Sequence, residues 1–351
     1  MRGWTDRGLR ALRRWRGVIG WALSLVLLSL VARELWAQWG ALRTQEITFS
    51  VGWGAVALAG LGVFMTSTSD AWRRLLLGMG HRISSREAFY AMFVSNLGKY
   101  IPGGVWSIVG RAGLAQMMGV SAASTFLSIL VETALQLIAA GIIVLLSLPA
   151  FSDHPLLDQP LILAVPLVVA MLLVHPRAIN AGLTLVRRVS KREVPRLEFS
   201  YGFMVRLLGQ YFCNWLLLGA SFAALGRAIM PAGLSGRELM ILVGGFALAW
   251  NAGVFAFFLP GGVGVREAAL VMVFGRSFPA GWPAALAIAA RVWITVGEIA
   301  CFGAAVLLGR LDPASRSREK PADVPAAASR PEVPETVSRP DVREAASRPD
   351  G

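Results

Sequence analysis

Long apolar runs constrain this chain most, because several of them reach the roughly 20 residues that a helix with a 1.5 Å rise needs to cross a bilayer. Hydrophobic residues make up 55% of the 351-residue sequence, and charged residues only 16%. Membrane strands would require alternating segments of about ten residues, and no such pattern occurs. The sequence therefore predicts an all-α polytopic membrane protein.

The apolar runs divide the chain into about six spanning helices and two interrupted stretches. The spans are expected at residues 18–36, 51–70, 122–148, 161–175, 201–229 and 283–308. The interrupted stretches, 88–118 and 238–276, are interpreted as re-entrant or broken helical hairpins. Residues 1–17 are a basic amino-terminal segment, 18–309 form the membrane domain, and 310–351 are rich in Pro, Ala and Ser and are expected to be disordered.

The formal net charge is +13, and the position of the basic residues is explained by the membrane topology. Arginines cluster beside the apolar runs and are not interleaved with exposed aromatic residues, so we expect no nucleic-acid partner. Cytoplasmic connections carry an excess of Lys and Arg. Arginine clusters before residue 18 and after residue 309 thus predict cytoplasmic termini, in a multi-pass protein of a bacterial plasma (inner) membrane.

Each interrupted stretch contains a helix-breaking Pro-Gly-Gly, in YIPGG at 100–104 and in FLPGG at 258–262. An asparagine precedes each break, Asn96 in the first stretch and Asn251 in the second. Unpaired backbone at membrane depth is tolerated only where it lines a cavity or is buried in protein. The charge rule places both ends of the first stretch on the cytoplasmic side and both ends of the second outside, so the sequence predicts an inverted repeat.

An arginine and a glutamate follow each break, but in opposite order in the two halves. Arg111 precedes Glu132, whereas Glu267 precedes Arg291, which predicts an ion pair between each hairpin and the helix after it. A charge at the bilayer centre costs about 2.5–3.5 kcal/mol on insertion scales, so such residues are rarely idle. Two interpretations stay open: the charges hold the hairpins in place, or they bind an anionic group.

The helix starts after the breaks favour an anion. Unpaired N–H groups and the positive end of the helix dipole suit a phosphate. Lys99 adds a cation to the first hairpin, and with Arg111 it gives this hairpin more positive charge than Glu132 neutralises. This excess favours Arg111 as a ligand of the substrate.

The stretches SNLGKYIPGGVWSIVGRAGLAQMMGVSAASTFLSILVET and FLPGGVGVREAALVMVF, with Arg291 downstream, resemble the lysylphosphatidylglycerol synthase transmembrane region family over approximately residues 10–310. This is the flippase-like membrane domain of the bacterial multiple peptide resistance factor, also found in stand-alone proteins. The resemblance implies transport of a membrane lipid with a polar, anionic or phosphate-containing headgroup. The candidate substrate-binding residues are Asn96, Lys99, Pro102, Gly103, Arg111, Glu132, Pro260, Gly261, Gly264, Arg266, Glu267 and Arg291.

Other functions are less well supported by the residues. Synthase members carry a soluble acyltransferase-like domain, which the tail 310–351 does not resemble, so aminoacyl transfer is not expected. A polyprenyl-phosphate transferase would use Glu132 or Glu267 as general acid or base, but no supporting histidines or acidic metal motif accompany them. We therefore expect no enzymatic activity, no cofactor and no metal site. A scaffold that recruits a lipid- or glycan-synthesis enzyme stays open, as does the oligomeric state.

Two smaller polar patterns occur in the spans. Arg206, Gln210 and Asn214 recur every fourth residue and form a stripe that either faces a cavity or hydrogen-bonds to a neighbouring helix. Asp70 lies one turn before Arg73 and Arg74, which predicts either a salt bridge near the membrane interface or a helix cap.

Overall fold

The structure is a computed structural model that describes residues 49–100, 105–151, 172, 175, 177–181, 184, 199–230, 233–255 and 264–310. The regular elements within these residues are all helical. The compact unit of the chain ends at Gly309. Outside the described residues lie the expected span 18–36, most of 161–175, the tail, and the break residues Pro102, Gly103, Pro260 and Gly261.

Five described helices are long and apolar enough to cross a membrane. They are α2 (Val51–Gly78), α5 (Ala122–Phe151), α8 (Tyr201–Ile229), α9 (Gly236–Phe255) and α11 (Trp282–Arg310). Four of them confirm the spans predicted at 51–70, 122–148, 201–229 and 283–308, and α2 continues to Gly78. The fifth, α9, forms the first part of the second interrupted stretch.

The remaining described helices are short. The first interrupted stretch contains α3 (Ser85–Asn96), the 3-10 helix η1 (Leu97–Tyr100) and α4 (Trp106–Met117), and the second ends with α10 (Val265–Phe274). A helix of 12 residues is about 18 Å long, against about 30 Å for the hydrocarbon core. Both α3 and α4 have 12 residues and α10 has 10, so none of them can cross alone. The 20-residue α9 can, and in this respect the two stretches differ.

Both interrupted stretches begin with the same local signal. Ser84 accepts a hydrogen bond from the backbone N–H of Glu87, whose carboxylate accepts one from the N–H of Ser84. Ser235 and Glu238 make the same two bonds before α9. Such a capping box satisfies two N–H groups that a helix start leaves unpaired. The sequence S-x-x-E thus fixes where each stretch becomes helical.

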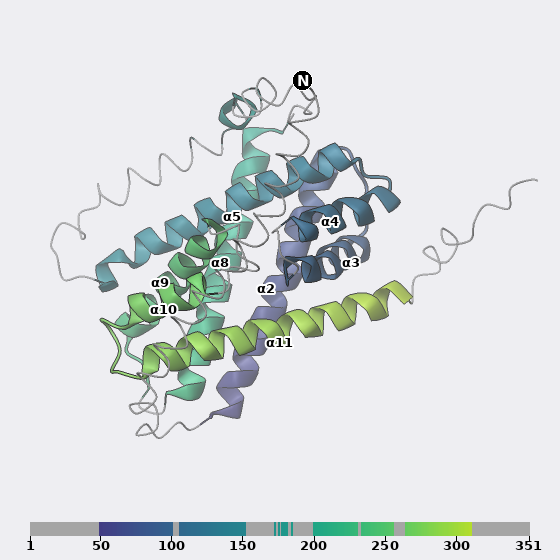
Figure 1. Cartoon of the computed structure of the whole chain (residues 1–351). Coiled ribbons are helices and arrows are strands. Elements are labelled where there is room, and N and C mark those ends of the chain that lie inside the picture. The colour runs from purple at the N-terminus through teal and green to yellow at the C-terminus, as the bar shows by residue number, and fades with distance from the viewer. Residues whose placement is uncertain are drawn as a thin grey trace, which may run out of the picture. The chain divides into compact units, whose positions relative to one another are not determined.

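Each stretch folds back on itself beside a long helix. The helices α3 and α4 lie next to each other, with α3 against α2 and α4 against α5, and α9 and α10 form a second neighbouring pair (Figure 1). Between the pairs, α2 packs along α8, and both α5 and α9 pack on α8. Close crossings depend on small residues, as at Gly297 of α11, where an added Cβ would lie 2.4 Å from Leu61.

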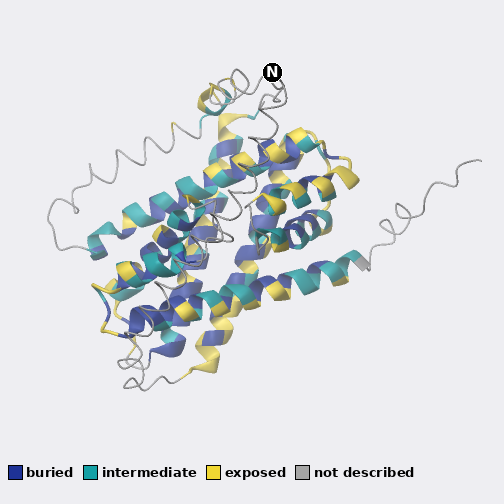
Figure 2. Ribbon diagram, viewed as in Figure 1, coloured by how far each residue is buried: buried dark blue, intermediate teal, exposed yellow. Residues whose placement is uncertain are grey.

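A cluster of aromatic rings lies in the packed interior, and large apolar side chains also cover the outside. Phe222, Phe246, Phe274 and Trp293 join α8, α9, α10 and α11, with the Phe222 and Phe246 ring centroids 4.5 Å apart. Exposed residues lie along the outward faces of the long helices (Figure 2). On α11 they form a stripe of Ile288, Val292, Val296 and Ile299. Such apolar surface suits contact with lipid chains.

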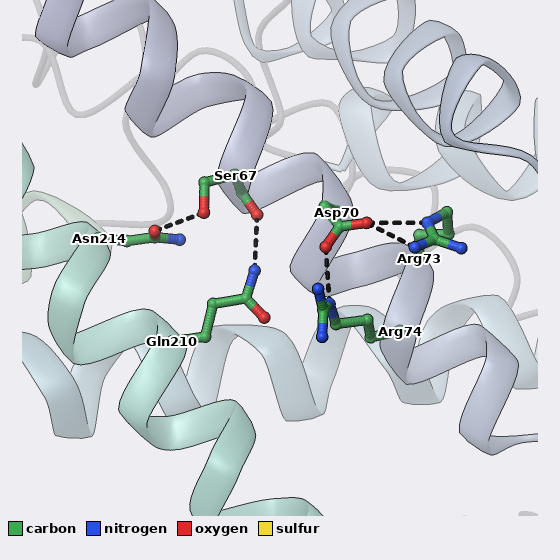
Figure 3. Close-up of polar contacts among 6 residues, drawn as sticks. All are labelled: Ser67, Asp70, Arg73, Arg74, Gln210 and Asn214. Carbon is green, nitrogen blue, oxygen red and sulfur yellow. Dashed lines mark hydrogen bonds and ion pairs between the residues drawn. The ribbon is translucent and has the colours of Figure 1, made fainter.

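Two of the three residues of the polar stripe on α8, Gln210 and Asn214, hydrogen-bond to α2, as the second interpretation of that stripe predicted, whereas Arg206 is exposed. Ser67 Oγ donates to Asn214 Oδ1 at 2.7 Å, and Gln210 Nε2 donates to the Ser67 carbonyl oxygen at 3.2 Å (Figure 3). One turn further along α2, Asp70 accepts from Arg73 and Arg74 at 2.7 and 2.6 Å, which confirms the predicted salt bridge. The two bonds of Ser67 join α2 to α8 and fix the register of these helices.

Candidate functional site

The first predicted ion pair joins α4 to α5. Arg111 Nη1 lies 2.7 Å from Glu132 Oε2, and only 14% of the arginine side chain and 5% of the glutamate side chain are exposed. The other carboxylate oxygen of Glu132 accepts from Gln136 Nε2 at 3.2 Å, one turn along α5. The pair is therefore short, buried and further hydrogen-bonded.

Neighbouring side chains hold Arg111 in this position. Its guanidinium carbon lies 5.3 Å from the ring centroid of Trp72, a distance at which a cation is attracted to the ring. The Trp72 indole N–H in turn donates to Ser128 Oγ at 2.9 Å, one turn before Glu132 on α5. Three helices, α2, α4 and α5, thus fix one arginine.

Two buried atoms beside this pair have no hydrogen-bond partner within the described residues: Arg111 Nε and the hydroxyl of Tyr211. Tyr211, on α8, is 1% exposed and lies within electrostatic reach of Arg111 and Glu132. A buried polar atom without a partner is uncommon and calls for a reason, such as a water molecule or a ligand.

The second predicted ion pair joins α10 to α11 and is looser. Arg291 Nη1 lies 3.6 Å from Glu267 Oε1, with exposed side-chain fractions of 33% and 15%. Glu267 also accepts the backbone N–H of Gly264 at 2.8 Å. Its carboxylate therefore has two partners, Arg291 and the backbone N–H directly before its own helix.

This bond corrects one expectation. The N–H groups at the start of α10 were expected to be free for an anion, but the N–H of Gly264, the residue directly before the helix, donates to the carboxylate of Glu267. The reason is local: Gly264, with φ +89°, turns the chain so that its N–H faces the side chain three residues on. Few side-chain-bearing residues adopt such a φ, which explains a glycine at this position.

Arg266 lies against α9. Its guanidinium carbon is 3.9 Å from the ring centroid of Trp250, and its stem covers Gly253, where an added Cβ would lie 2.4 Å from Arg266 Nε. A larger residue at 253 would displace the arginine. The absence of a side chain at Gly253 therefore leaves room for the cation of Arg266.

A small cavity opens at the second pair. Its walls come from α9, α10 and α11, and its volume is about 20 Å³, room for about one water molecule. The lining includes the charged side chains of Arg266, Glu267 and Arg291, together with Trp250. In this conformation the site admits water but not a lipid headgroup.

Lys99 forms an ion pair that the sequence reasoning missed. From η1 it contacts Glu298, the single carboxylate of α11, whose side chain is 9% exposed. The positive charge that the first hairpin carries beyond what Glu132 neutralises is therefore matched by Glu298 on α11. Two isolated opposite charges, each in an apolar segment, were the signal that could have found this pair.

The two halves meet on α11. Arg291 and Glu298 lie about two turns apart on this helix, so they share a face. Arg291 binds the start of α10, and Glu298 binds η1, the element directly before the first break. Arg266 and Arg291 are both close enough to Lys99 for their charges to interact with it. We call Lys99, Arg266, Glu267, Arg291 and Glu298 the central cluster; it contains three cations and two carboxylates.

Other candidate residues contribute less. Asn96 ends α3 and is half-buried. Asn251 has a buried Oδ1 with no hydrogen-bond partner within the described residues. Gly98 lies directly against the start of α4, since an added Cβ would be 2.6 Å from the Ser107 nitrogen. In the part of the chain that the structure describes, His, Cys, Asp and Glu form no group of three able to hold a metal ion.

Comparison with protein families gives a match that covers most of the chain: residues 17–297 match the lysylphosphatidylglycerol synthase TM region. The chain belongs to this family. The match includes both interrupted stretches and Arg291 and ends one residue before Glu298. No curated protein and no solved structure matches the chain. Family membership together with the apolar helices establishes a multi-pass membrane protein of the lysylphosphatidylglycerol synthase TM region family.

Proposed function

We propose that this protein moves a membrane lipid with an anionic, phosphate-containing headgroup from one leaflet to the other, without changing it chemically. The observation that carries the proposal is the central cluster. It brings three cations and two carboxylates together inside the membrane domain. Charged residues inside a membrane domain are costly and mark pathways for polar substrates.

The same cluster supports a broken-helix architecture. We infer that 88–118 and 238–276 reach into the membrane from opposite sides as an inverted repeat, although α9 is long enough to cross by itself. Support comes from the shared capping boxes, the short α3, α4 and α10, and the contact of both hairpins with one face of α11. Transporters built from inverted repeats bind substrate where such broken helices meet.

The proposed membrane is a bacterial plasma membrane, with both termini in the cytoplasm. Arginine clusters at both ends support this orientation. A reporter that is active only outside the cytoplasm is expected to give no signal when fused to either end. A signal at either terminus would exclude the orientation.

The cavity at the second pair fits a closed conformation. About 20 Å³ does not accommodate a phosphate group, so transport requires the hairpins to separate from α11. Opening would expose Arg291 and Arg266 first, because the 3.6 Å pair is the weaker of the two predicted ion pairs. The headgroup would then replace carboxylates as the partner of these cations.

Lipid movement can be measured in phosphatidylcholine vesicles that contain the purified protein and a trace of fluorescent phosphatidylglycerol. A membrane-impermeant quencher added outside reports how fast inner-leaflet lipid arrives. We expect faster arrival than in protein-free vesicles, and slower arrival for fluorescent phosphatidylcholine, which has no net negative charge. Equal rates for the two lipids would contradict an anionic substrate.

A matched pair of variants tests whether the central cluster is responsible. Arg291→Gln removes a cluster cation, whereas Arg227→Gln removes an arginine of α8 that lies outside the cluster and contacts Trp53 on α2. Only the first is expected to slow phosphatidylglycerol, by tenfold or more if one charge-assisted bond of about 1.5–3 kcal/mol is lost. If both variants transport normally, the cluster is not the binding site.

A further inference from the structure

Two arginines line the same cavity from different helices. Arg266 belongs to α10 and Arg291 to α11, and both contribute to the walls of the cavity at the second ion pair, together with Glu267. A guanidinium is a planar fork of N–H donors that binds two oxygens of one phosphate at once. Two forks at one cavity therefore match a phosphate group that offers each of them its own pair of oxygens.

The number of such oxygen pairs depends on how the phosphate is esterified. A phosphate diester has two terminal oxygens and thus one pair, whereas a monoester has three terminal oxygens and three pairs. Two guanidinium groups can bind different pairs of a monoester, but they have to share the single pair of a diester. The two arginines therefore favour a phosphate that carries no second ester.

The first arginine, Arg266, is held in place by α9. Its guanidinium carbon lies 3.9 Å from the ring centroid of Trp250, and Trp250 contacts the buried ring of Trp215 at 5.8 Å between centroids. Its stem lies against Gly253, where an added Cβ would be 2.6 Å from Arg266 Cγ. An arginine has five N–H donors, so it can bind a phosphate in addition to other partners. Arg266 is thus a pre-positioned donor, which loses less freedom when a ligand binds.

The second arginine, Arg291, is held loosely. Its Nη1 is 3.6 Å from Glu267 Oε1, beyond hydrogen-bond distance, and 33% of its side chain is exposed. A ligand at Arg291 has to compete with this carboxylate. A phosphate diester carries a single negative charge, as an ionised carboxylate does, whereas a monoester carries about 1.5 to 2 near pH 7. A monoester therefore competes for Arg291 better than a diester.

We propose that the lipid bound at the central cluster is a phosphate monoester, with Arg266 and Arg291 each binding a different pair of its terminal oxygens. Such a lipid carries its phosphate at the end of the headgroup, with nothing esterified beyond it. The inference rests on the proposed function and narrows its substrate class, because anionic phosphate headgroups also include diesters. Diesters are then weaker ligands of the same site.

Binding of short-chain lipids to the purified protein in detergent tests the substrate class. Phosphatidic acid is the monoester, and phosphatidylmethanol, which adds one methyl ester, is a matched diester of nearly the same size. Isothermal calorimetry is expected to give about tenfold or more tighter binding for phosphatidic acid, the effect of one further charge-assisted contact. Phosphatidylglycerol, a second diester, should bind like phosphatidylmethanol, and phosphatidylcholine, which has no net charge, more weakly than either.

Two pairs of matched variants test the role of Arg266. Arg266→Lys keeps the charge but removes the fork, and Arg227→Lys makes the same change at an arginine that also lies over a tryptophan, outside the cluster. Gly253→Ala places a methyl group against Arg266, and Gly113→Ala places one where nothing lies within 4 Å. The first variant of each pair is expected to reduce the preference for phosphatidic acid over phosphatidylmethanol to less than about threefold. The second variant of each pair should keep the preference of the natural protein.

The outcomes separate this inference from the proposed function. Equal affinities of the natural protein for phosphatidic acid and phosphatidylmethanol would overturn the monoester, and tighter binding of phosphatidylglycerol than of phosphatidylcholine would leave the proposed function intact. This comparison of lipids needs no variant, so it decides even if a variant does not fold. A preference that survives in folded Arg266→Lys and Gly253→Ala would overturn the role of Arg266.

A soluble phosphate is the remaining comparison. Glycerol 3-phosphate has the monoester of phosphatidic acid without its acyl chains, and it is expected to bind more weakly. Binding as tight as that of phosphatidic acid would make a soluble phosphate the ligand and overturn the lipid substrate. Absence of binding of every anionic lipid to the folded protein would overturn both this inference and the proposed function.

Discussion

The two halves contain the same pair of charges in opposite order, yet they use it differently. In the first half Arg111 and Glu132 are 2.7 Å apart and nearly inaccessible, whereas in the second half Arg291 and Glu267 are 3.6 Å apart beside a cavity. Glu132 also binds Gln136 within its own helix, while Glu267 divides its carboxylate between Arg291 and a backbone N–H. From this comparison we propose that the first pair stabilises the fold and that the second is available to a ligand.

The same glutamate-to-glutamine change in both halves gives the largest expected effect. Glu132→Gln leaves Arg111 as an uncompensated buried ion, which costs about 3–5 kcal/mol when a buried pair is broken. Glu267→Gln keeps an oxygen for the Gly264 N–H and loses only a loose, partly exposed pair, a cost of about 1 kcal/mol. Equilibrium unfolding in mixed micelles measures both.

A double variant controls for the charge itself. Arg111→Gln with Glu132→Gln removes both ions, so it should recover part of the stability that Glu132→Gln loses. If Glu267→Gln destabilises as much as Glu132→Gln, the distinction between a structural and a ligand-binding pair is wrong.

Glycine-to-alanine changes at the hairpin tips are expected to destabilise the protein less, and for a different reason at each tip. At Gly98 an added Cβ meets the backbone of α4 at 2.6 Å, so Gly98→Ala should cost about 1–3 kcal/mol through overpacking. At Gly264 the cause is the φ of +89°, and Gly264→Ala should cost about 1–2 kcal/mol through backbone strain. Thermal unfolding in detergent is the measurement.

Gly113 provides the matched control on α4. An added Cβ there meets nothing within 4 Å, and alanine favours the helix, so Gly113→Ala should gain about 0.5–1 kcal/mol. Were Gly98→Ala as harmless as Gly113→Ala, the first tip would not be packed as described.

The sequence predicted the bounds of the helices better than the contacts between distant helices. The span predicted at 201–229 coincides with α8, because an apolar run of spanning length begins directly after Ser200, whose side chain accepts a bond from the Phe203 N–H. Both ion pairs of exchanged sign were also predicted. In apolar surroundings the nearest opposite charge on the next helix is the natural partner, and local order in the chain suffices to find it.

Contacts that depend on packing between distant helices were not predictable in this way. Lys99 and Glu298 are 199 residues apart in sequence, and they meet only because η1 lies against the middle of α11. The sequence also could not decide whether α9 crosses by itself, because the arms on either side of the Pro-Gly-Gly break are of borderline spanning length. The assignment of Arg111 as a substrate ligand stays a prediction, now without the excess charge that favoured it.

The smallest expected effect concerns the interior around the first pair. Ser128 accepts the indole N–H of Trp72, so Ser128→Ala leaves a buried donor unpaired, at about 1–3 kcal/mol. The Tyr211 hydroxyl is also buried but has no partner within the described residues. Removing an unsatisfied group is nearly neutral, and Tyr211→Phe should therefore change the free energy of unfolding by less than about 1 kcal/mol. The first half of the molecule is purely structural only if this difference between the two variants is found. A loss in Tyr211→Phe as large as that in Ser128→Ala would mean that the hydroxyl binds a water molecule or a ligand beside Arg111, and the first half would then share in binding.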